Sequence, residues 1–289
     1  MVKEIYVKSV LNKHKKRDSW FLDDYSLNPY KLCQYDCIYC YIRGSKYGEN
    51  MGKELAVKVN APLVLAHELK RRADKGEYGF IAVASATEPW MSLEEKYMVT
   101  RKCLEVIARY RFPVHCLTKS TLILRDLDLL KEIDKNAILP KDLQKLKHGV
   151  LITFSLSTLK EEVAKIFEPG APSLWRRLDT LRELKKKGFY AGIAYIPVLP
   201  FLSDSDEELE EMVKTAKKLE ADYVFFGTLT LQGEGRNLYF KVLEKRFPHL
   251  VEKYREIYVK WYPVKSYCST FYRKINNLCK KYNIKLGII

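Results

Sequence analysis

The sequence has 289 residues, of which 47% are hydrophobic and 30% are charged, and its formal net charge at pH 7 is +15. This length allows one large domain or two small ones with a buried core. Charged residues interrupt positions 1–16, where a signal peptide would need an apolar run, and no stretch has the length of a membrane span. We therefore expect a cytoplasmic protein without membrane contact.

The positive charge is concentrated at the two ends of the chain. Residues 1–20 contain six Lys or Arg and two acids, residues 251–289 contain nine and two, and residues 21–250 carry only +4. We expect a basic N-terminal arm over 1–20, a core over 21–250 and a basic C-terminal extension over 251–289 packed on that core. Such ends suit a polyanionic partner such as nucleic acid, although charge that only keeps the protein soluble explains them as well.

Three of the seven cysteines, Cys33, Cys37 and Cys40, form a tight C-x3-C-x2-C group. A disulfide framework is not expected in a cytosolic chain with an odd number of cysteines. A closed zinc site needs a fourth ligand, usually from a second Cys or His pair, and the five histidines are far apart in the sequence. A ferredoxin-type cluster also needs four thiolates. Three thiolates on one short loop instead suit a four-iron cluster with one iron open to an outside ligand.

Beyond the cysteines, short runs rich in β-branched and aromatic residues alternate with amphipathic stretches, which is typical of a parallel sheet with helices between its strands. The sequence predicts six such units and an α/β fold, with the first strand running into Cys33. The other predicted strands are Tyr78–Ala86, Pro113–Leu117, Gly149–Leu156, Phe189–Val198 and Asp222–Thr230.

The helices between the strands carry start signals and apolar faces. Ser92 with Glu95 and Ser205 with Glu208 have the spacing of a capping box. Apolar residues at helical spacing predict three buried faces: Thr100, Cys103, Leu104 and Ile107; Leu174, Leu178, Leu181 and Leu184; Leu209, Met212, Val213 and Ala216. The scattered cysteines 103, 116, 268 and 279 are interpreted as small buried hydrophobic residues.

Polar side chains follow the predicted strands, at the edge where ligands bind in parallel α/β barrels. They are Ser85, Thr87 and Glu88, then Lys119 and Ser120, then Ser155 and Ser157. Helix capping explains the serines and threonines equally well, so Lys119 is the strongest candidate among them.

The C-x3-C-x2-C group followed by the aromatic Tyr41 resembles the signature of the radical S-adenosylmethionine (SAM) superfamily. The resemblance implies a 4Fe-4S cluster on Cys33, Cys37 and Cys40, with the amine and carboxylate of SAM on its open iron. An electron from a donor such as a ferredoxin or flavodoxin then cleaves SAM to methionine and a 5′-deoxyadenosyl radical. By its position, Tyr41 would lie against the adenine.

The cofactor implied by this resemblance carries a carboxylate and an amine, which need a cation and an acceptor. Lys119 is expected to pair with the carboxylate, and Thr87 or Glu88 to accept from the amine. Ser155 is expected to hydrogen-bond the ribose or the carboxylate.

Longer stretches resemble one branch of the superfamily, the spore photoproduct lyase-like or DNA repair photolyase-like proteins. They are Ser26–Tyr30, Asn60–Pro62, Leu117–Thr121 and Phe167–Pro172. The resemblance covers roughly residues 5–235 and implies a partial (β/α)6 barrel of the TIM type, with the basic arm before it and a C-terminal helical extension after it. It also implies lyase-like chemistry on a DNA lesion.

The same branch suggests catalytic tyrosines. Tyr39 and Tyr41 match a C-x-Y-C-Y motif whose tyrosines are implicated in relaying a hydrogen atom, with packing against adenine as the alternative for Tyr39. Where that lyase has a hydrogen-donor cysteine, this sequence has Ser85, whose O–H bond is too strong to donate to a thymine radical. Cys116 replaces it only if its side chain points into the barrel mouth.

The C-terminal extension allows two interpretations. Lys260–Tyr262 and Phe271–Lys274 interleave basic and aromatic residues, as a nucleic-acid stacking surface does. An apolar face predicts docking on the barrel, with basic side chains pointing outward. The face consists of Phe271, Ile275, Leu278 and Tyr282, and the outward residues are Arg273, Lys274, Lys280 and Lys281.

Three hypotheses of function remain at this point. The first is a radical enzyme acting on nucleic acid, through lesion repair or base modification. The second is the same chemistry on a protein side chain or small molecule. The third is a metal-binding regulatory module without turnover.

Overall fold

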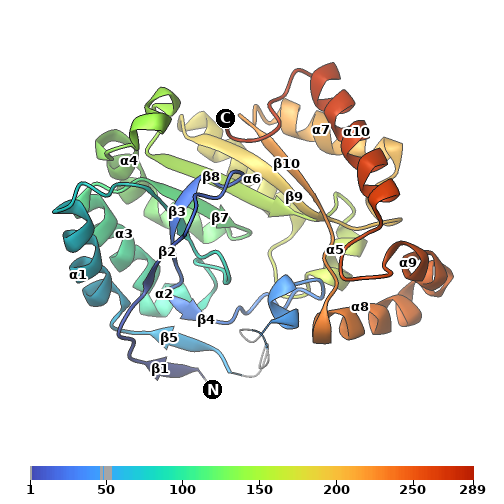
Figure 1. The fold of residues 1–289 in the computed structure, drawn as a ribbon, viewed down its shortest axis with the longest axis horizontal. Helices are drawn as coiled ribbons and strands as arrows, with labels where there is room; N and C mark the ends of the chain where they lie inside the picture. The colour runs from blue at the N-terminus through green and yellow to red at the C-terminus, as the bar shows by residue number, and fades with distance from the viewer. Residues whose placement is uncertain (1, 46–47, 49–53) are drawn as a thin grey trace.

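The computed structural model describes residues 2–45, 48 and 54–289, so the predicted arm is described from residue 2 onward. Within these ranges a seven-stranded sheet has the order β10-β9-β8-β7-β6-β3-β2 (Figure 1). The strands are β2 (Leu11–Lys13), β3 (Asp23–Leu27), β6 (Phe80–Val83), β7 (Val114–Thr118), β8 (Val150–Leu156), β9 (Tyr190–Val198) and β10 (Val224–Thr228). Neighbours from β3 to β10 are parallel, and β2 joins β3 antiparallel.

A helix follows each parallel strand before the next one begins. These helices are α1 (Ala61–Ala73), α3 (Val99–Tyr110), α4 (Leu127–Asn136), α6 (Leu174–Lys186), α7 (Asp206–Lys218) and α8 (Gly233–Arg246). Shorter segments lie between them: α2 (Leu93–Tyr97), α5 (Glu161–Phe167) and the 3-10 turns η2 (Thr121–Asp126) and η3 (Lys141–Leu146). Because the strands are adjacent in chain order and the sheet is open, the fold is a partial (β/α)6 barrel of the TIM type, as predicted.

The predicted core faces are buried. Every residue of β8 is buried in the middle of the sheet. The apolar faces predicted for α3, α6 and α7 are buried as well, including Cys103. These faces pack the helices against the sheet.

Two local predictions need correction. The strand predicted over Tyr78–Ala86 is shorter, because Ala84 adopts a left-handed backbone with φ of 62° and turns the chain out of the sheet after β6. Ser92 precedes α2 but does not cap it, since its hydroxyl donates to Gln34 Oε1 at 3.0 Å. The cap at Ser205 is confirmed, because its Oγ accepts from the backbone of Glu208 at 3.2 Å.

The two ends of the chain pack on this barrel. Near the N-terminus, β1 (Lys3–Ile5), β5 (Ala56–Lys58) and β4 (Tyr30–Lys31) form a small sheet in the order β1-β5-β4. The C-terminal part contains η4 (Pro248–Leu250), α9 (Val251–Ile257) and α10 (Lys265–Lys281). No helix within the described ranges is both long and apolar enough to cross a bilayer.

Helix α10 lies against α7. Phe271 and Ile275 of α10 are buried, as the predicted docking face requires. Two of the cations expected to point outward have acidic partners on α7: Lys274 pairs with Asp206 at 2.6 Å, and Lys281 pairs with Glu210 at 2.7 Å. Part of the positive charge of the extension is therefore neutralised within the fold.

Candidate active site

The three clustered cysteines lie on a loop, here called the cysteine loop (residues 32–40), between β4 and the 3-10 turn η1 (Tyr41–Gly44). Leu32 and Asp36 have left-handed backbones, with φ of 64° and 51°, and each directly precedes a cysteine. The amide of Cys40 donates to the carbonyl oxygen of Cys37 at 3.2 Å. Arg43 Nε donates to the same oxygen at 3.0 Å. Two hydrogen bonds to the Cys37 carbonyl therefore hold the loop in a turn.

All nine predicted site residues line one cavity of about 370 Å³. They are Cys33, Cys37, Tyr39, Cys40, Tyr41, Thr87, Glu88, Lys119 and Ser155. The remaining walls include residues at the carboxyl ends of β9 and β10, such as Ile196 and Thr228. The chain reversal after each parallel strand brings these distant positions to one edge of the barrel.

The cavity holds a cation beside its thiols. Lys119 Nζ donates to Ser155 Oγ at 2.7 Å and lies 5.9 Å from the centre of the Tyr39 ring. Burial raises the pKa of the Cys37 thiol, and the charge of Lys119 acts in the opposite direction. Lys119 and Ser155, predicted from separate strand ends, are thus in direct contact.

Thr87 and Glu88 differ in what they leave open to a ligand. Glu88 is 5% exposed and accepts three hydrogen bonds, from the backbone of Trp90 at 3.1 Å, the hydroxyl of Thr118 at 2.5 Å and the backbone of Lys119 at 2.9 Å. Burial raises the pKa of Glu88, and these bonds oppose that effect. Thr87 Oγ1 is buried and has no hydrogen-bond partner among the described residues. A buried orphan hydroxyl in a cavity suits a ligand that brings a donor.

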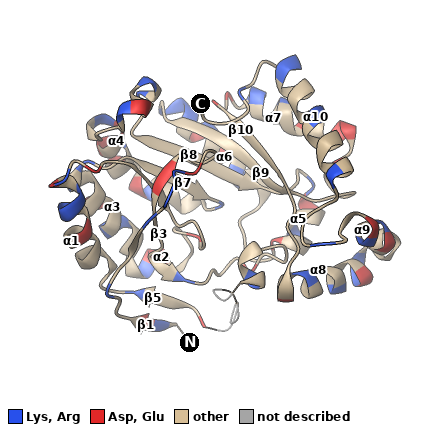
Figure 2. Ribbon diagram, in the orientation of Figure 1, with Lys and Arg blue, Asp and Glu red and all other residues tan. Residues whose placement is uncertain are grey.

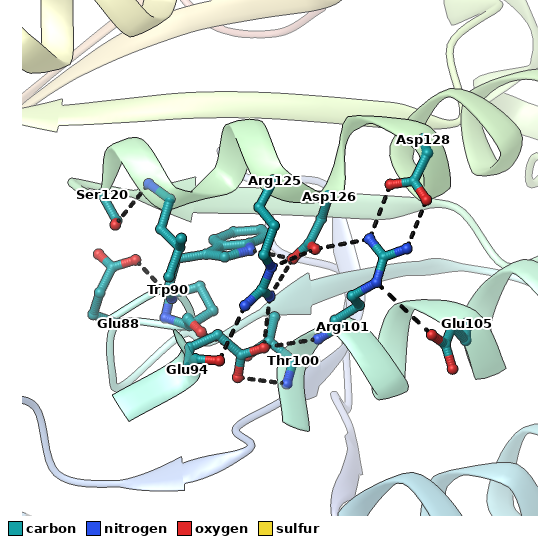
Figure 3. Close-up of polar contacts among 12 residues, drawn as sticks. Glu88, Trp90, Glu94, Thr100, Arg101, Glu105, Ser120, Arg125, Asp126 and Asp128 are labelled. Atoms are coloured by element: carbon teal, nitrogen blue, oxygen red, sulfur yellow. Dashed lines mark hydrogen bonds and ion pairs between the residues drawn. The ribbon is translucent and has the colours of Figure 1, made fainter. Parts of the chain in front are cut away.

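Figure 3 shows the polar network around Glu88 and the segment that follows it. The indole of Trp90 donates to Asp126 at 2.8 Å, and Asp126 pairs with Arg125 at 2.7 Å and with Arg101 at 3.0 Å. Arg125 also pairs with the fully buried Glu94 at 2.8 Å. This network fixes the segment after β6, so that Thr87 and Glu88 face the cavity from a rigid support.

Tyr39 belongs to a buried cluster on the other side of the cavity. Tyr39 is 8% exposed and donates its hydroxyl to Glu168, which also accepts from Ser157 at 2.9 Å. Glu168 pairs with Arg177 at 2.5 Å, and both side chains are almost fully buried. Burial alone would raise the pKa of Glu168, but the charges of Arg177 and Lys119 hold it below its usual value. The carboxylate is therefore ionised.

Glu168 and Arg177 were not among the predicted site residues. Glu168 lies in the stretch Phe167–Pro172, which carried part of the family resemblance, and this was the only signal for it. Arg177 directly precedes Leu178 on a helix, and the sequence alone gives no sign that its side chain is buried. Its guanidinium instead donates to the carbonyl oxygens of Pro172 at 2.8 Å and Ser155 at 3.2 Å.

A second cavity, of about 530 Å³, shares Phe21, Tyr41, Ala84, Ser85 and Leu117 with the first. Its other walls include residues from the predicted arm. They are His14, Lys16, Arg17, Asp18 and Ser19.

Tyr41 stands at the junction of the cavities, with 54% of its surface exposed and its hydroxyl donating to the Ser85 carbonyl at 2.7 Å.

Cys116 does not meet the condition set for a hydrogen donor. It is fully buried within the hydrophobic core and is absent from the described lining of either cavity.

The donor set fits an iron-sulfur cluster with an open position. Three cysteines of one loop share a cavity with a lysine, an orphan threonine hydroxyl and aromatic rings. Among the described residues no group of His, Cys, Asp or Glu side chains is placed to hold a single metal ion. A cubane is wider than one ion and takes its thiolates at separate corners. Three thiols of one loop in a cavity at the mouth of an α/β barrel suit an enzyme of the iron-sulfur class.

The chain belongs to the radical SAM superfamily, which it matches over residues 27–216. It is a radical SAM enzyme whose cofactors are a 4Fe-4S cluster and SAM. An uncharacterised protein of Mycobacterium tuberculosis is 28% identical over 288 residues, which cover 97% of this chain and 81% of that protein. An uncharacterised protein of Methanocaldococcus jannaschii is 30% identical over 233 residues, which cover 79% and 78%.

Solved structures share the fold at low sequence identity. A cysteine-to-serine variant of spore photoproduct lyase has a TM-score of 0.72 and 15% identity, over 97% of this chain and 79% of that one. A cysteine-to-alanine variant with dinucleoside spore photoproduct has a TM-score of 0.70 and 15% identity, over 97% and 78%. Streptococcus suis SuiB bound to its precursor peptide SuiA has a TM-score of 0.56 and 13% identity, over 93% and 48%.

Proposed function

We propose that this radical SAM enzyme acts on nucleic acid, by repairing a lesion or modifying a base. The observation that carries the proposal is the second cavity, which shares Tyr41 and Ser85 with the first. Phe21 and Tyr41 line this cavity with aromatic rings, and Lys16 of the basic arm adds a cation to the same wall. Arg17 of that wall is already paired with Asp24 and Asp142. The likeness to a lyase solved with a dinucleoside lesion supports the same substrate class.

The residues of the first cavity suit the cofactors. Cys33, Cys37 and Cys40 would hold the cluster, and the bound cluster and SAM supply a 5′-deoxyadenosyl radical. Lys119 would pair with the SAM carboxylate, and Ser155, already bonded to Lys119, would orient that pair. Of the two acceptors considered for the SAM amine, Thr87 is favoured, because three protein donors already occupy Glu88.

The two tyrosines take different roles in this proposal. The hydroxyl of Tyr39 is committed to Glu168, so Tyr39 positions the wall of the first cavity and keeps its proton on the phenol oxygen. Burial raises the pKa of Tyr39 well above its usual value, which keeps it neutral. Tyr41 is half-exposed and lines both cavities, which supports a role for it in contacting both SAM and substrate.

The experiment that tests the substrate class follows deuterium from 5′-deuterated SAM. Anaerobically reconstituted protein is incubated with ultraviolet-irradiated DNA, undamaged DNA, RNA or a peptide mixture, and products are analysed by mass spectrometry. We expect label or a new product only with nucleic acid, and binding that weakens steeply with salt. Label in the peptide arm alone would favour the protein-substrate hypothesis, for which the likeness to SuiB gives a precedent in fold.

The cluster assignment has its own test. We expect reconstituted protein to bind four irons and cleave SAM to 5′-deoxyadenosine and methionine under strong reductant. Cys37→Ala is expected to abolish both. Cys116→Ala is the matched control, because it removes a buried thiol outside the described cavity walls. SAM cleavage that survives in the Cys37 variant would contradict the assignment.

A further inference from the structure

A groove on the outside of the barrel lies between α5 and α8, with a volume of about 510 Å³. We call it the α5–α8 groove. Its described lining consists of two partly buried apolar residues and four exposed cations: Ile166 and Val242, with Lys165, Lys241, Lys245 and Arg246. Figure 2 shows basic residues along α8 on the side of the molecule away from α4.

The cations of this groove are not neutralised by nearby acids. Among the described residues, none of the four forms an ion pair within 4.0 Å, and Glu244 of α8 lies 4.0 Å from Arg255 instead. The C-terminal extension behaves differently, because Lys274 and Lys281 are paired with acids of α7. The groove therefore offers a compact positive charge to a partner.

Helix α5 connects the groove to the cysteine loop. Phe167, the last residue of α5, follows Ile166, and its carbonyl oxygen accepts from the amide of Ile38 at 2.8 Å. Ile38 is the residue directly after Cys37. The Phe167 ring also stacks on Tyr239 of α8, with a centroid distance of 5.1 Å.

Helix α8 supports the same loop from its N-terminal end. A Cβ added to Gly235 would lie 3.2 Å from Arg43 Cβ and 3.7 Å from the Cys40 carbonyl oxygen. One wall of the groove is thus hydrogen-bonded to the cysteine loop through Phe167. The other wall belongs to a helix that packs on the loop at Gly235, about two helical turns before Val242. None of the groove residues contributes to the described lining of the two cavities, so the groove is separate from the cofactor and substrate positions.

We propose that the α5–α8 groove is the docking site of an acidic one-electron carrier protein that reduces the cluster. The proposal rests on the radical SAM chemistry assigned above. One electron passes from the reduced carrier to the cluster and the carrier is oxidised by one electron, with no bond made or broken. Electron-transfer encounters use small interfaces, and charge complementarity raises their association rate. A groove with four cations around two apolar residues, on the two helices that contact the cysteine loop, matches these requirements.

The test compares two reductants in anaerobic, cluster-loaded protein. The variant Lys241→Glu with Lys245→Glu reverses two groove charges one helical turn apart. The matched control is Lys131→Glu with Lys135→Glu, at the same spacing on exposed positions of α4. SAM cleavage is measured with dithionite and, separately, with reduced flavodoxin at varied concentration and salt. The Kd of oxidised flavodoxin for each protein is measured by calorimetry and is expected to change as the KM does.

With dithionite, we expect equal rates in the wild type and both variants, because a small reductant needs no docking site. With flavodoxin, we expect the α8 variant to raise the KM for the carrier at least about tenfold and to flatten its salt dependence. The α4 variant should behave as the wild type. A neutral version, Lys241→Gln with Lys245→Gln, should give a smaller rise in the same direction.

An unchanged KM for flavodoxin in the α8 variants overturns the docking site. Equal loss in the α8 and α4 variants overturns it too, because general charge would then explain the effect. The groove could instead bind a nucleic-acid backbone, so the affinity for a single-stranded DNA oligonucleotide is measured in parallel. If the α8 charges change that affinity and leave the flavodoxin KM unchanged, the proposal is wrong. Failure of the nucleic-acid substrate would leave this assay unaffected, since it follows SAM cleavage without substrate.

Discussion

The buried pair of Glu168 and Arg177 gives the sharpest stability prediction. The substitution Glu168→Gln keeps the shape of the side chain and removes its charge. Arg177, with 1% of its side chain exposed, then loses its counter-ion at 2.5 Å but stays buried through its bonds to Pro172 and Ser155. Breaking a buried ion pair on one side costs about 3–5 kcal/mol, because a charge is left uncompensated.

A loss of this size is a large fraction of the stability of an ordinary domain, which is about 5–15 kcal/mol. It is measured by anaerobic urea unfolding followed by tryptophan fluorescence. The control is Glu183→Gln, whose carboxylate pairs with Lys187 at 3.6 Å while both side chains are well exposed. An exposed pair contributes about 1 kcal/mol or less, so the control should barely move the transition.

Removing both charges tests the reasoning further. The double variant Glu168→Leu with Arg177→Met leaves no buried unpaired ion, so its cost should be clearly smaller than the sum of the two single substitutions. If Glu168→Gln destabilises no more than Glu183→Gln, the carboxylate is not a buried partner of Arg177. Tyr39 would then not be held by an ionised Glu168.

Three further predictions concern the cavity and the barrel interior. Lys119→Met should weaken SAM binding about 10- to 100-fold without changing the iron content, because a charged hydrogen bond is worth about 1.5–3 kcal/mol. The affinity is measured by anaerobic calorimetry, and an unchanged affinity would remove Lys119 from the SAM site. Thr87→Val should weaken SAM binding while leaving the urea transition in place, because its hydroxyl has no partner among the described residues; a destabilised protein with normal SAM affinity would refute this. Burial lowers the pKa of His115 to about 4, so the neutral form stabilises the fold fully above pH 6.5 and this stability, about 3 kcal/mol, is lost as the pH falls towards 4. His115→Gln should remove this contribution to the pH dependence of the unfolding free energy. An unaltered pH dependence would show that His115 does not make that contribution.

Much of the barrel was predictable from local sequence because its signals are short in range. The alternation of apolar runs and amphipathic stretches predicted six strand-helix units, since each strand and helix must bury one face. The same logic brought Lys119 and Ser155 together: the carboxyl ends of neighbouring parallel strands share one edge, and the two side chains are 2.7 Å apart. The cysteine spacing favoured a four-iron cluster with one open iron, and its resemblance to the radical SAM signature implied the chemistry.

Tertiary structure alone decided which polar groups pair. Tyr39 and Glu168 are 129 positions apart, and no local pattern relates them. The chain fold also paired Lys274 and Lys281 with α7, while it gathered in one groove four cations of α5 and α8 that form no ion pair with any residue the structure describes. Hydrophobic periodicity follows from burial of one face of a helix or strand, so it is visible in a short stretch of sequence. The partner of a charge depends on which elements the packed barrel places side by side.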